Sequence, residues 1–272
     1  MRTIKFILFF ALTLFVNSCT NDEFDDLGYS TDNGHIKSIS ANGITVQKYL
    51  YDKNGKIMEE NSSFYFKKYI YDENGRLEKV ETAFDNSIAS SSYYVPRKTE
   101  LMTSQNSTAE NFSLYNYDKG KLSKIEYYSN LTEDDFEYRS MRTFEYKGGN
   151  IIRENLHDTS GQITQYYVYT YDKNGNVSNE KYYTNLFGSK DELSYEVFYK
   201  YDNYKNPYRI FSMTGSPGMN TNANNIIESY SISYNDYAGI DKESRSKTRY
   251  KYNHKGYPIK EIVGNNEFEY NY

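Results

Sequence analysis

Three short stretches place aspartate, asparagine and glycine at a spacing that calcium loops also use. They are DKNG at 52–55, DENG at 72–75 and DKNG at 172–175. A calcium loop of the EF-hand type also needs a glutamate at its twelfth position. Counting from each aspartate reaches Ser63, Ala83 and Tyr183 instead. The three stretches are therefore predicted to be turns, and no metal site is expected there.

Other residues that could ligate a metal or attack a substrate are few and scattered. His35, His157 and His254 lie far apart in the sequence, without Cys, His or carboxylate partners at metal-ligand spacing. HDTSG at 157–161 differs from the aspartic-protease triplet by an extra residue, and no G-x-S-x-G is present. We predict a protein that is not an enzyme, with no metal and no cofactor.

Tyrosine is the residue type that remains, with 33 Tyr and 15 Phe among 272 residues and no Trp. Flat rings with polar rims can stack on sugars or pack against a partner protein. Adjacent tyrosines in a strand point to opposite faces, so one ring of each pair is a candidate for ligand contact. The candidate pairs are Tyr93-Tyr94, Tyr127-Tyr128, Tyr166-Tyr167 and Tyr182-Tyr183.

The elements that carry these tyrosines come from an internal repeat. Seven units share an aromatic-x-Tyr core: Tyr49-Leu50-Tyr51, Tyr69-Ile70-Tyr71, Tyr115-Asn116-Tyr117, Phe144-Glu145-Tyr146, Tyr169-Thr170-Tyr171, Tyr199-Lys200-Tyr201 and Tyr250-Lys251-Tyr252. Phe268-Glu269-Tyr270 is expected to close the chain as a half unit. The gaps from Tyr71 to Tyr117 and from Tyr201 to Tyr252 are long, which predicts a degenerate unit or a long loop in each.

Each core is followed by residues typical of a tight hairpin turn. Asp52, Asp72, Asp118 and Asp172 can accept from backbone amides, and Gly55, Gly75, Gly120 and Gly175 tolerate positive φ. A type I turn with a bulged glycine predicts five aromatic–aliphatic pairs across the hairpins, and a turn one residue shorter keeps the last two of them. The pairs are Tyr51–Ile57, Tyr71–Leu77, Tyr171–Val177, Tyr117–Leu122 and Tyr146–Ile151.

The fold predicted is all-β: an elongated antiparallel sheet of consecutive hairpins over residues 34–272, with little helix. Whether such a sheet is open, closed or spiral does not follow from the repeat. Residues 87–111 and 212–225 are expected to be irregular loops. Asn206-Pro207 and Pro258 interrupt the pattern, which predicts edge or broken strands there.

The motif Y-x-Y-D-x-x-G-x-L resembles the YD (RHS-type) repeat, and most closely the short repeat-bearing lipoproteins of Bacteroidota. The resemblance rests on Tyr51-Asp52-Gly55-Ile57, Tyr71-Asp72-Gly75-Leu77, Tyr117-Asp118-Gly120-Leu122 and Tyr171-Asp172-Gly175-Val177. It covers about half of the chain and implies a repeat sheet. Large YD-repeat proteins wind their sheet into a shell around a toxin, which the resemblance implies only for far longer chains.

Residues 1–18 are predicted to be a lipoprotein signal peptide. Arg2 and Lys5 precede an apolar run from Phe6 to Val16, too short to span a bilayer. Val16-Asn17-Ser18-Cys19 resembles a bacterial lipoprotein processing site, which implies lipidation of Cys19, the single cysteine of the chain. Residues 19–33 are predicted to be an acidic tether, in which Asp22, Glu23, Asp25 and Asp26 are similar to the surface-export signal of Bacteroidota lipoproteins.

Charge and address narrow the function. Without Arg2 and Lys5 the chain keeps 30 basic and 37 acidic residues, a net charge of −7 that argues against nucleic-acid binding. We predict an exported outer-membrane lipoprotein, cell-surface exposed, attached to the membrane through Cys19. Its expected role is a non-catalytic binding or scaffold module for a glycan or an envelope protein. Two alternatives stay open: an envelope hydrolase with paired carboxylates, and a passive structural surface component.

Overall fold

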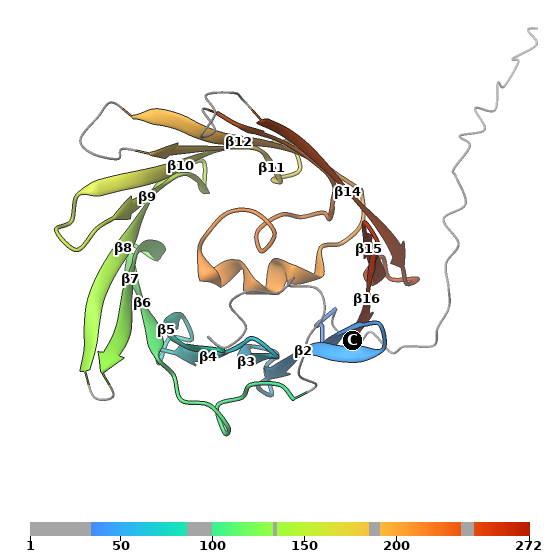
Figure 1. Cartoon of the computed structure of the whole chain (residues 1–272), viewed down its shortest axis with the longest axis horizontal. Helices are drawn as coiled ribbons and strands as arrows, with labels where there is room; N and C mark the ends of the chain where they lie inside the picture. Colours follow the sequence, from blue (N-terminus) through green and yellow to red (C-terminus); the bar gives the residue numbers. More distant parts are fainter. Residues whose placement is uncertain (1–33, 86–99, 133–134, 185–190, 235–241) are drawn as a thin grey trace, which may run out of the picture.

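The chain folds into one closed antiparallel barrel, seen end-on in Figure 1. The computed structural model describes residues 34–85, 100–132, 135–184, 191–234 and 242–272. The predicted leader, Cys19 and the acidic tether lie outside the described residues. The strands are β1 (Ser38–Ala41), β2 (Ile44–Tyr51), β3 (Ile57–Ser62), β4 (Tyr65–Tyr71), β5 (Leu77–Phe84), β6 (Asn111–Asp118), β7 (Lys121–Thr132), β8 (Asp135–Lys147), β9 (Asn150–His157), β10 (Ile163–Tyr171), β11 (Val177–Thr184), β12 (Glu192–Tyr201), β13 (Ile226–Ser233), β14 (Lys242–Tyr252), β15 (Pro258–Val263) and β16 (Asn266–Asn271).

The prediction of an elongated sheet is wrong, because the first and last strands pair with each other. β1 and β16 are antiparallel, with Ser38 opposite Asn271 and Ile39 opposite Tyr270. Closure pairs the backbone groups that an open sheet would leave along its two edges. The physical reason for the barrel is therefore a contact between the two ends of the described chain, which no local pattern encodes.

The hairpin pairs predicted from the repeat are confirmed. Tyr51 lies opposite Ile57, and the other four aromatic–aliphatic pairs show the same register. The turns are built as expected: Asp52 Oδ1 accepts from the amides of Asn54 and Lys56, both at 2.8 Å, and Gly55 has a φ of +80°. These turns lie at one end of the barrel, here called the tip end. The opposite end is called the far end.

A bulge follows each turn and changes which side chains face inward. Leu50 lies opposite Glu59 while Tyr51 lies opposite Ile57, so Met58 is one extra residue on β3. The extra residue brings Ile57 and Glu60 to the same face, although they are three residues apart. The same shift occurs in the next hairpins along the chain. Simple two-residue alternation therefore fails at every tip.

The second tyrosine of a unit ties that unit to the one before it. Its hydroxyl donates to the backbone carbonyl of the aliphatic residue that follows the preceding turn. The seven donor–acceptor pairs are Tyr51–Ile36, Tyr71–Ile57, Tyr117–Leu77, Tyr146–Leu122, Tyr171–Ile151, Tyr201–Val177 and Tyr272–Pro258, with oxygen–oxygen distances of 2.6–2.9 Å. The tyrosine spacing of the sequence is thus a record of contacts between neighbouring hairpins.

These bonds also correct the half unit at the C-terminus. Tyr272 makes the bond expected of a second tyrosine, so the final core is Tyr270-Asn271-Tyr272 and not Phe268-Glu269-Tyr270. Ile36 accepts the bond from Tyr51, which gives it the place of the aliphatic residue after a turn. The first and last segments therefore complete one unit between them, and the barrel consists of eight units.

A segment between β12 and β13 folds back into the lumen, where Figure 1 shows it in orange. We call residues 202–225 the plug. The Asp202 amide donates to the Asn225 carbonyl, and the Asn225 amide donates to Asp202 Oδ1, both at 3.1 Å. The same two bonds close the ordinary turn from Asp52 to Lys56. The plug is therefore an enlarged hairpin tip, and it accounts for the second long gap of the repeat.

The plug contains the one helix of the described residues, the 3-10 helix η3 (Pro207–Thr214). Asn206 caps its first turn by accepting from the Tyr208 amide at 3.0 Å, and Pro207 follows at a position that needs no amide donor. Of the two alternatives predicted for both prolines, an edge strand or an interrupted one, Asn206-Pro207 shows the interruption. At Pro258 the structure shows neither, because β15 begins there and pairs on both sides.

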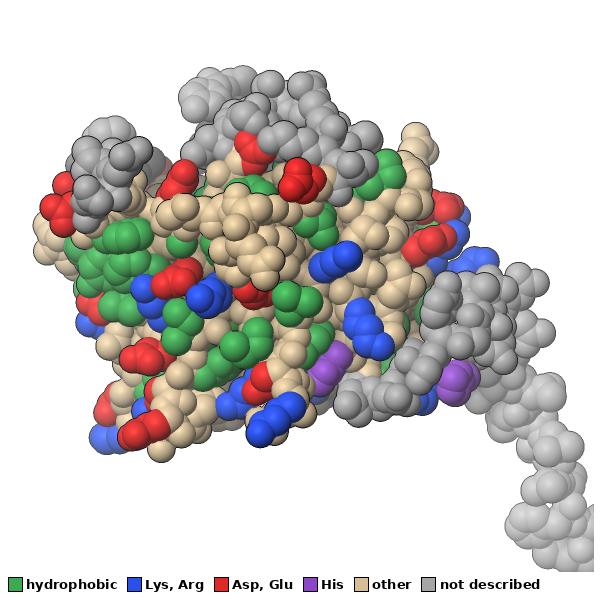
Figure 2. All heavy atoms as spheres, turned by 90° about the horizontal axis from the view of Figure 1, so that it is seen from below, with side chains coloured by type: hydrophobic (Ala, Val, Ile, Leu, Met, Phe, Trp, Pro, Cys, Tyr) green, Lys and Arg blue, Asp and Glu red, His purple; other side chains and the backbone are tan. Residues whose placement is uncertain are grey.

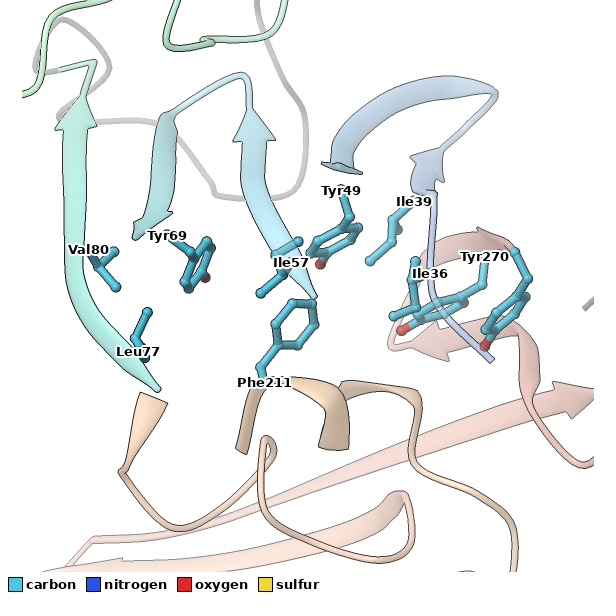
Figure 3. Close-up of a cluster of buried hydrophobic side chains, with 10 residues drawn as sticks. Ile36, Ile39, Tyr49, Ile57, Tyr69, Leu77, Val80, Phe211 and Tyr270 are labelled. Atoms are coloured by element: carbon cyan, nitrogen blue, oxygen red, sulfur yellow. The ribbon is translucent and has the colours of Figure 1, made fainter. Parts of the chain in front are cut away.

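Two surfaces of the plug bind it to the barrel. Asn176 Oδ1, on a neighbouring tip, accepts from the amides of Ala223 and Asn224 at 2.8 and 3.0 Å. On the other wall, the Phe211 ring packs 5.3 Å from that of Tyr49, within the buried cluster of Figure 3. The plug is thereby held across the lumen and divides it into two chambers.

The outer wall carries ion pairs together with exposed apolar side chains such as Leu50 and Phe198. Figure 2 shows basic and acidic side chains interleaved over one side of the barrel. The pairs that lie along the wall strands include Lys79–Glu81, Lys124–Glu126, Lys181–Glu196, Lys200–Glu228 and Lys260–Glu267, at 2.8–3.3 Å. Within the described residues, no helix has the length and hydropathy needed to cross a membrane.

Candidate functional site

The lumen carries two levels of aromatic side chains. The second tyrosines form the level next to the tips, and the first aromatics of the units form the next level inward. Each first aromatic lies opposite a residue on the neighbouring strand. That residue comes three positions after the aliphatic residue that follows a turn. These opposed pairs are Tyr270–Ile39, Tyr49–Glu60, Tyr69–Val80, Tyr115–Ile125, Phe144–Glu154, Tyr169–Glu180, Tyr199–Ser229 and Tyr250–Glu261.

Four of those eight positions are glutamates that face the lumen: Glu60, Glu154, Glu180 and Glu261. The sequence analysis missed them, because the bulge at each tip breaks the two-residue count. A count of three residues from the aliphatic position would have found all four. Buried carboxylates are rare without partners, so each one marks a polar centre inside the barrel.

Glu60 lies on one wall of the lumen at the centre of a hydrogen-bond cluster. Its carboxylate accepts from the hydroxyls of Tyr65 at 2.7 Å and Tyr69 at 2.9 Å, and from Lys67 Nζ at 3.3 Å. Gln47 Nε2 also donates to it. The side chain is 8% exposed, so these donors replace most of its contact with water. Burial, with the charge of Glu60 as a smaller cause, raises the pKa of Tyr69 well above its ordinary value.

Glu154 and Arg142 form a second charged centre. Arg142 Nη1 donates to Glu154 Oε1 at 2.7 Å and to Ser216 Oγ of the plug at 3.0 Å. The hydroxyl of Tyr169 donates to the other oxygen of Glu154 at 3.1 Å. Burial alone would lower the pKa of Arg142, but Tyr127 and Glu154 outweigh it and raise that pKa. Arg142 therefore stays charged and connects the plug to the wall.

Glu180 and Glu261 are the two inner carboxylates with altered pKa values. Burial first, and the neighbouring charge of Glu154 second, raise the pKa of Glu180 to about 7. Burial also raises the pKa of Glu261, against hydrogen bonds from Tyr270 and Tyr250 that act in the opposite direction. Glu180 therefore titrates near neutral pH.

The larger chamber lies toward the far end and has a volume of about 800 Å³. We call it the far chamber. Its walls combine aromatic rings with hydrogen-bonding and charged groups, and the plug forms its floor. The lining that matters here is Tyr49, Glu60, Tyr65, Lys67, Tyr69, Tyr115, Tyr127 and Arg142 from the barrel, with Phe211 and Asn220 from the plug. Its size falls within the range of small-molecule sites.

A smaller chamber of about 510 Å³ lies on the tip side of the plug. It is lined by second tyrosines, among them Tyr71, Tyr117, Tyr146 and Tyr171. The residue before each aliphatic position covers the tyrosine of the next unit: Lys56 Nζ lies 5.0 Å from the Tyr71 ring, and Lys121 Nζ lies 5.2 Å from the Tyr146 ring. The hydroxyls of these tyrosines are used in hydrogen bonds between units.

The Tyr166-Tyr167 and Tyr182-Tyr183 doublets place one ring on each face of the wall, whereas Tyr127 and Tyr128 both line the far chamber. Tyr167 and Tyr182 face each other inside with ring centroids 4.8 Å apart. Tyr166 and Tyr183 stack outside at 4.7 Å, and the Arg153 guanidinium lies 3.8 Å from the Tyr166 ring. Tyr127 lines the far chamber beneath Arg142, while Tyr128 stacks on Phe112 at its mouth. Tyr93 and Tyr94 lie outside the described residues.

Metal chemistry finds no support in the part of the chain that the structure describes, where no three His, Cys, Asp or Glu side chains gather as a ligand set. The predicted loop at 212–225 proves to be the end of η3 and the rest of the plug, and Asn220 brings it to the far chamber. Of the loop predicted at 87–111, residues 100–110 are irregular and Asn111 begins β6.

No protein-family model and no curated protein matches this chain. Among solved structures, it is similar to a porin-like protein from Bacteroides vulgatus ATCC 8482, at 12% identity and a TM-score of 0.52, over 88% of this chain and 99% of that one. A porin-like protein from Bacteroides uniformis ATCC 8492 matches at 11% identity and a TM-score of 0.37, over 86% of this chain and 96% of that one. The Tc holotoxin pore of Photorhabdus luminescens matches at 13% identity and 0.30, over 80% of this chain and 10% of that one. The first likeness establishes the fold alone: this chain shares its barrel with a porin-like protein of Bacteroides.

Proposed function

We propose that the chain is a lipid-anchored envelope protein whose far chamber binds a saccharide without catalysis. The observation that carries the proposal is the far chamber itself. Its rings offer flat apolar faces for the C–H faces of a sugar, and its hydroxyl, carboxylate and ammonium groups offer partners for sugar hydroxyls. The fixed cluster around Glu60 presents these groups in a preset arrangement, which lowers the ordering cost of binding.

The outer wall supports a barrel surrounded by water. A strand that spans a bilayer carries apolar side chains on its outward face. Here that face carries ion pairs such as Lys124–Glu126 and Lys200–Glu228. Membrane attachment is therefore assigned to the lipid expected on Cys19. The similarity to a porin-like protein is assigned to a shared barrel architecture. An outer-membrane location, with the barrel exposed at the cell surface, follows from the predicted leader and acidic tether.

A glycan array and an envelope pull-down test the binding role. Lys67→Met removes a charged donor from the chamber. The control, Lys68→Met, removes the same charge from the next residue, which points to the outer wall. Loss of a charge-assisted hydrogen bond should weaken glycan binding about tenfold or more in the first variant only. Thermal unfolding of both variants checks that the barrel is intact. Absence of any glycan or protein ligand, or equal loss in both variants, would overturn the proposal.

A hydrolase is the second candidate, and one observation favours it. Burial, with Glu154 as a smaller cause, raises the pKa of Glu180 to about 7, so Glu180 can carry a proton beside a second carboxyl group. Against this role, Glu154 is 1% exposed and is held by Arg142 and Tyr169. Its oxygens are therefore occupied by protein donors, which favours a structural role. Hydrolysis of an array glycan that stops in Glu180→Gln would reverse this order of preference.

A further inference from the structure

In the described residues, the turns at the two ends of the barrel carry opposite charge. In the described tips (residues 52–56, 72–76, 118–121, 147–150, 172–176, 202–206 and 253–257), eight basic side chains are exposed against two acidic ones, Glu73 and Asp118. The basic residues are Lys53, Arg76, Lys119, Lys121, Lys147, Lys173, Lys205 and Lys255. The aspartates that open the longer turns are tied to turn amides and are less exposed. The tip end is thus a basic ring.

The far end lacks this basic ring. Its described loops cover residues 42–43, 63–64, 85, 100–110, 158–162, 191, 234 and 264–265. Within them there is no Lys or Arg, whereas Asp85, Glu100, Glu110, Asp158 and Asp191 are acidic. The mouth of the far chamber therefore lies at the acidic end. An anionic surface would attract the tip end and repel the far end.

The chain enters the barrel at the basic end. His35 stacks on Tyr51 with ring centroids 4.9 Å apart, and a Cβ on Gly34 would collide with the Tyr257 ring, so both residues lie among the tips. Residues 19–33 precede this point. Fifteen residues can reach at most about 50 Å when fully extended. A lipid on Cys19 would therefore be joined to the barrel at the basic ring and would keep that ring within about 50 Å of the bilayer.

We propose that the basic ring of the tip end docks on the anionic headgroups of a phospholipid bilayer, so that the far chamber opens away from the membrane. Lysines near such a surface add attraction that falls off within a Debye length. The orientation rests on the proposed anchor at Cys19, whereas the headgroup contact depends only on the tips. The acidic residues of the tether compete for the same lysines, so the test keeps the tether in place.

Vesicle co-sedimentation tests the contact with the unlipidated mature chain, residues 19–272 carrying Cys19→Ser. Binding is expected to phosphatidylcholine vesicles that contain about 30 mol % phosphatidylglycerol and not to pure phosphatidylcholine vesicles. It should be lost as salt rises from about 0.1 M to about 1 M, where the Debye length shortens from about 10 Å to 3 Å. Equal binding to both vesicles, or no binding to either, would overturn the proposal.

Two matched variants assign the contact to the tips. Replacing Lys53, Lys119, Lys147, Lys173 and Lys255 by Gln should lower partitioning about tenfold or more, since all five apex charges are lost. Replacing the exposed wall residues Lys48, Lys200, Lys242, Lys247 and Arg249 by Gln removes the same charge and should change partitioning about twofold or less. Equal loss in both variants would show attraction by net charge alone and refute the docking face. Glycan binding by the tip variant reports separately on the far chamber.

Discussion

The hydroxyl of Tyr171 donates a 2.6 Å hydrogen bond to the backbone carbonyl of Ile151, which belongs to the preceding unit. The bond joins two hairpins and not two strands of one hairpin. Tyr252 is the exception: its hydroxyl donates to Asp202, the first residue of the plug. The bond is therefore replaced only in the unit that follows the enlarged tip, because Tyr201, which precedes the plug, still bonds Val177.

Removing one of these bonds should weaken the barrel without disturbing its packing. Tyr171→Phe keeps the ring and deletes the donor, so the free energy of unfolding should fall by about 1 kcal/mol. Tyr183→Phe, on the outer face of the next strand, is the control and should change it by less than about 0.5 kcal/mol. Urea denaturation measures both. Equal effects would mean that the bond between units contributes nothing specific.

One unit is shared between the first and last described segments of the chain, so the stability of the barrel should depend strongly on its last residues. Deletion of residues 270–272 removes Tyr270 and Tyr272, which are 3% and 7% exposed, and the partners of Ile39 and Pro258. Burial of two tyrosines contributes about 4 kcal/mol, so the truncated chain should unfold at much lower urea. Tyr272→Phe loses only a hydroxyl, so its free energy of unfolding should fall by about 1 kcal/mol. A truncated chain as stable as the whole would contradict closure by these residues.

The seat of the plug depends on a glycine. Gly215 has a φ of +99°, and a Cβ there would lie 2.5 Å from Leu122 Cδ2. Gly215→Ala should destabilise the protein by about 2–4 kcal/mol through strain and collision together. Gly218 has a φ of +122°, and a Cβ there would have no heavy atom within 4 Å. Gly218→Ala therefore measures the backbone strain alone, about 1–2 kcal/mol. Differential scanning calorimetry distinguishes them, and identical losses would show that Gly215 makes no close contact.

The raised pKa of Glu180 should make the protein less stable as the pH rises. Its pKa is raised to about 7 by burial and by Glu154, so the folded state binds a proton that the unfolded state releases above about pH 4.5. The stabilisation is complete below that value and is lost as the pH rises through about 7. The loss in the free energy of unfolding should reach up to about 3 kcal/mol. Urea unfolding at several pH values should show this slope, and Glu180→Gln should abolish most of it. Glu145→Gln, on the outer wall, should leave the slope unchanged.

The lipid anchor is tested by fractionation of cells. Cys19→Ser removes the sulfur that would carry the lipid, so the full-length chain should move from the membrane fraction to the soluble fraction. Tyr93→Phe is a control substitution that leaves the leader and the cysteine in place. Protein that remains with the membrane at high salt after Cys19→Ser would show that the lipoprotein interpretation is wrong.

The local structure could be predicted from the sequence because its signals are local. Asp52 and Gly55 favour a turn through their own backbone bonds, and the count from Tyr51 to Ile57 follows from that turn. Tyr166-Tyr167 and Tyr182-Tyr183 alternate across the wall because successive side chains of a strand point to opposite faces. The inner glutamates were missed because the bulge shifts the count by one residue.

Only the tertiary structure decided closure, the plug and the chamber. The pairing of Ile39 with Tyr270 joins residues from opposite ends of the chain, and either half of that unit looks incomplete in the sequence. The stretch 202–225 reads as an interruption until the Asp202–Asn225 bonds show it to be a hairpin tip turned inward. Glu60 and Arg142 reach one chamber because the barrel curves around it, and curvature is a property of all the strands together.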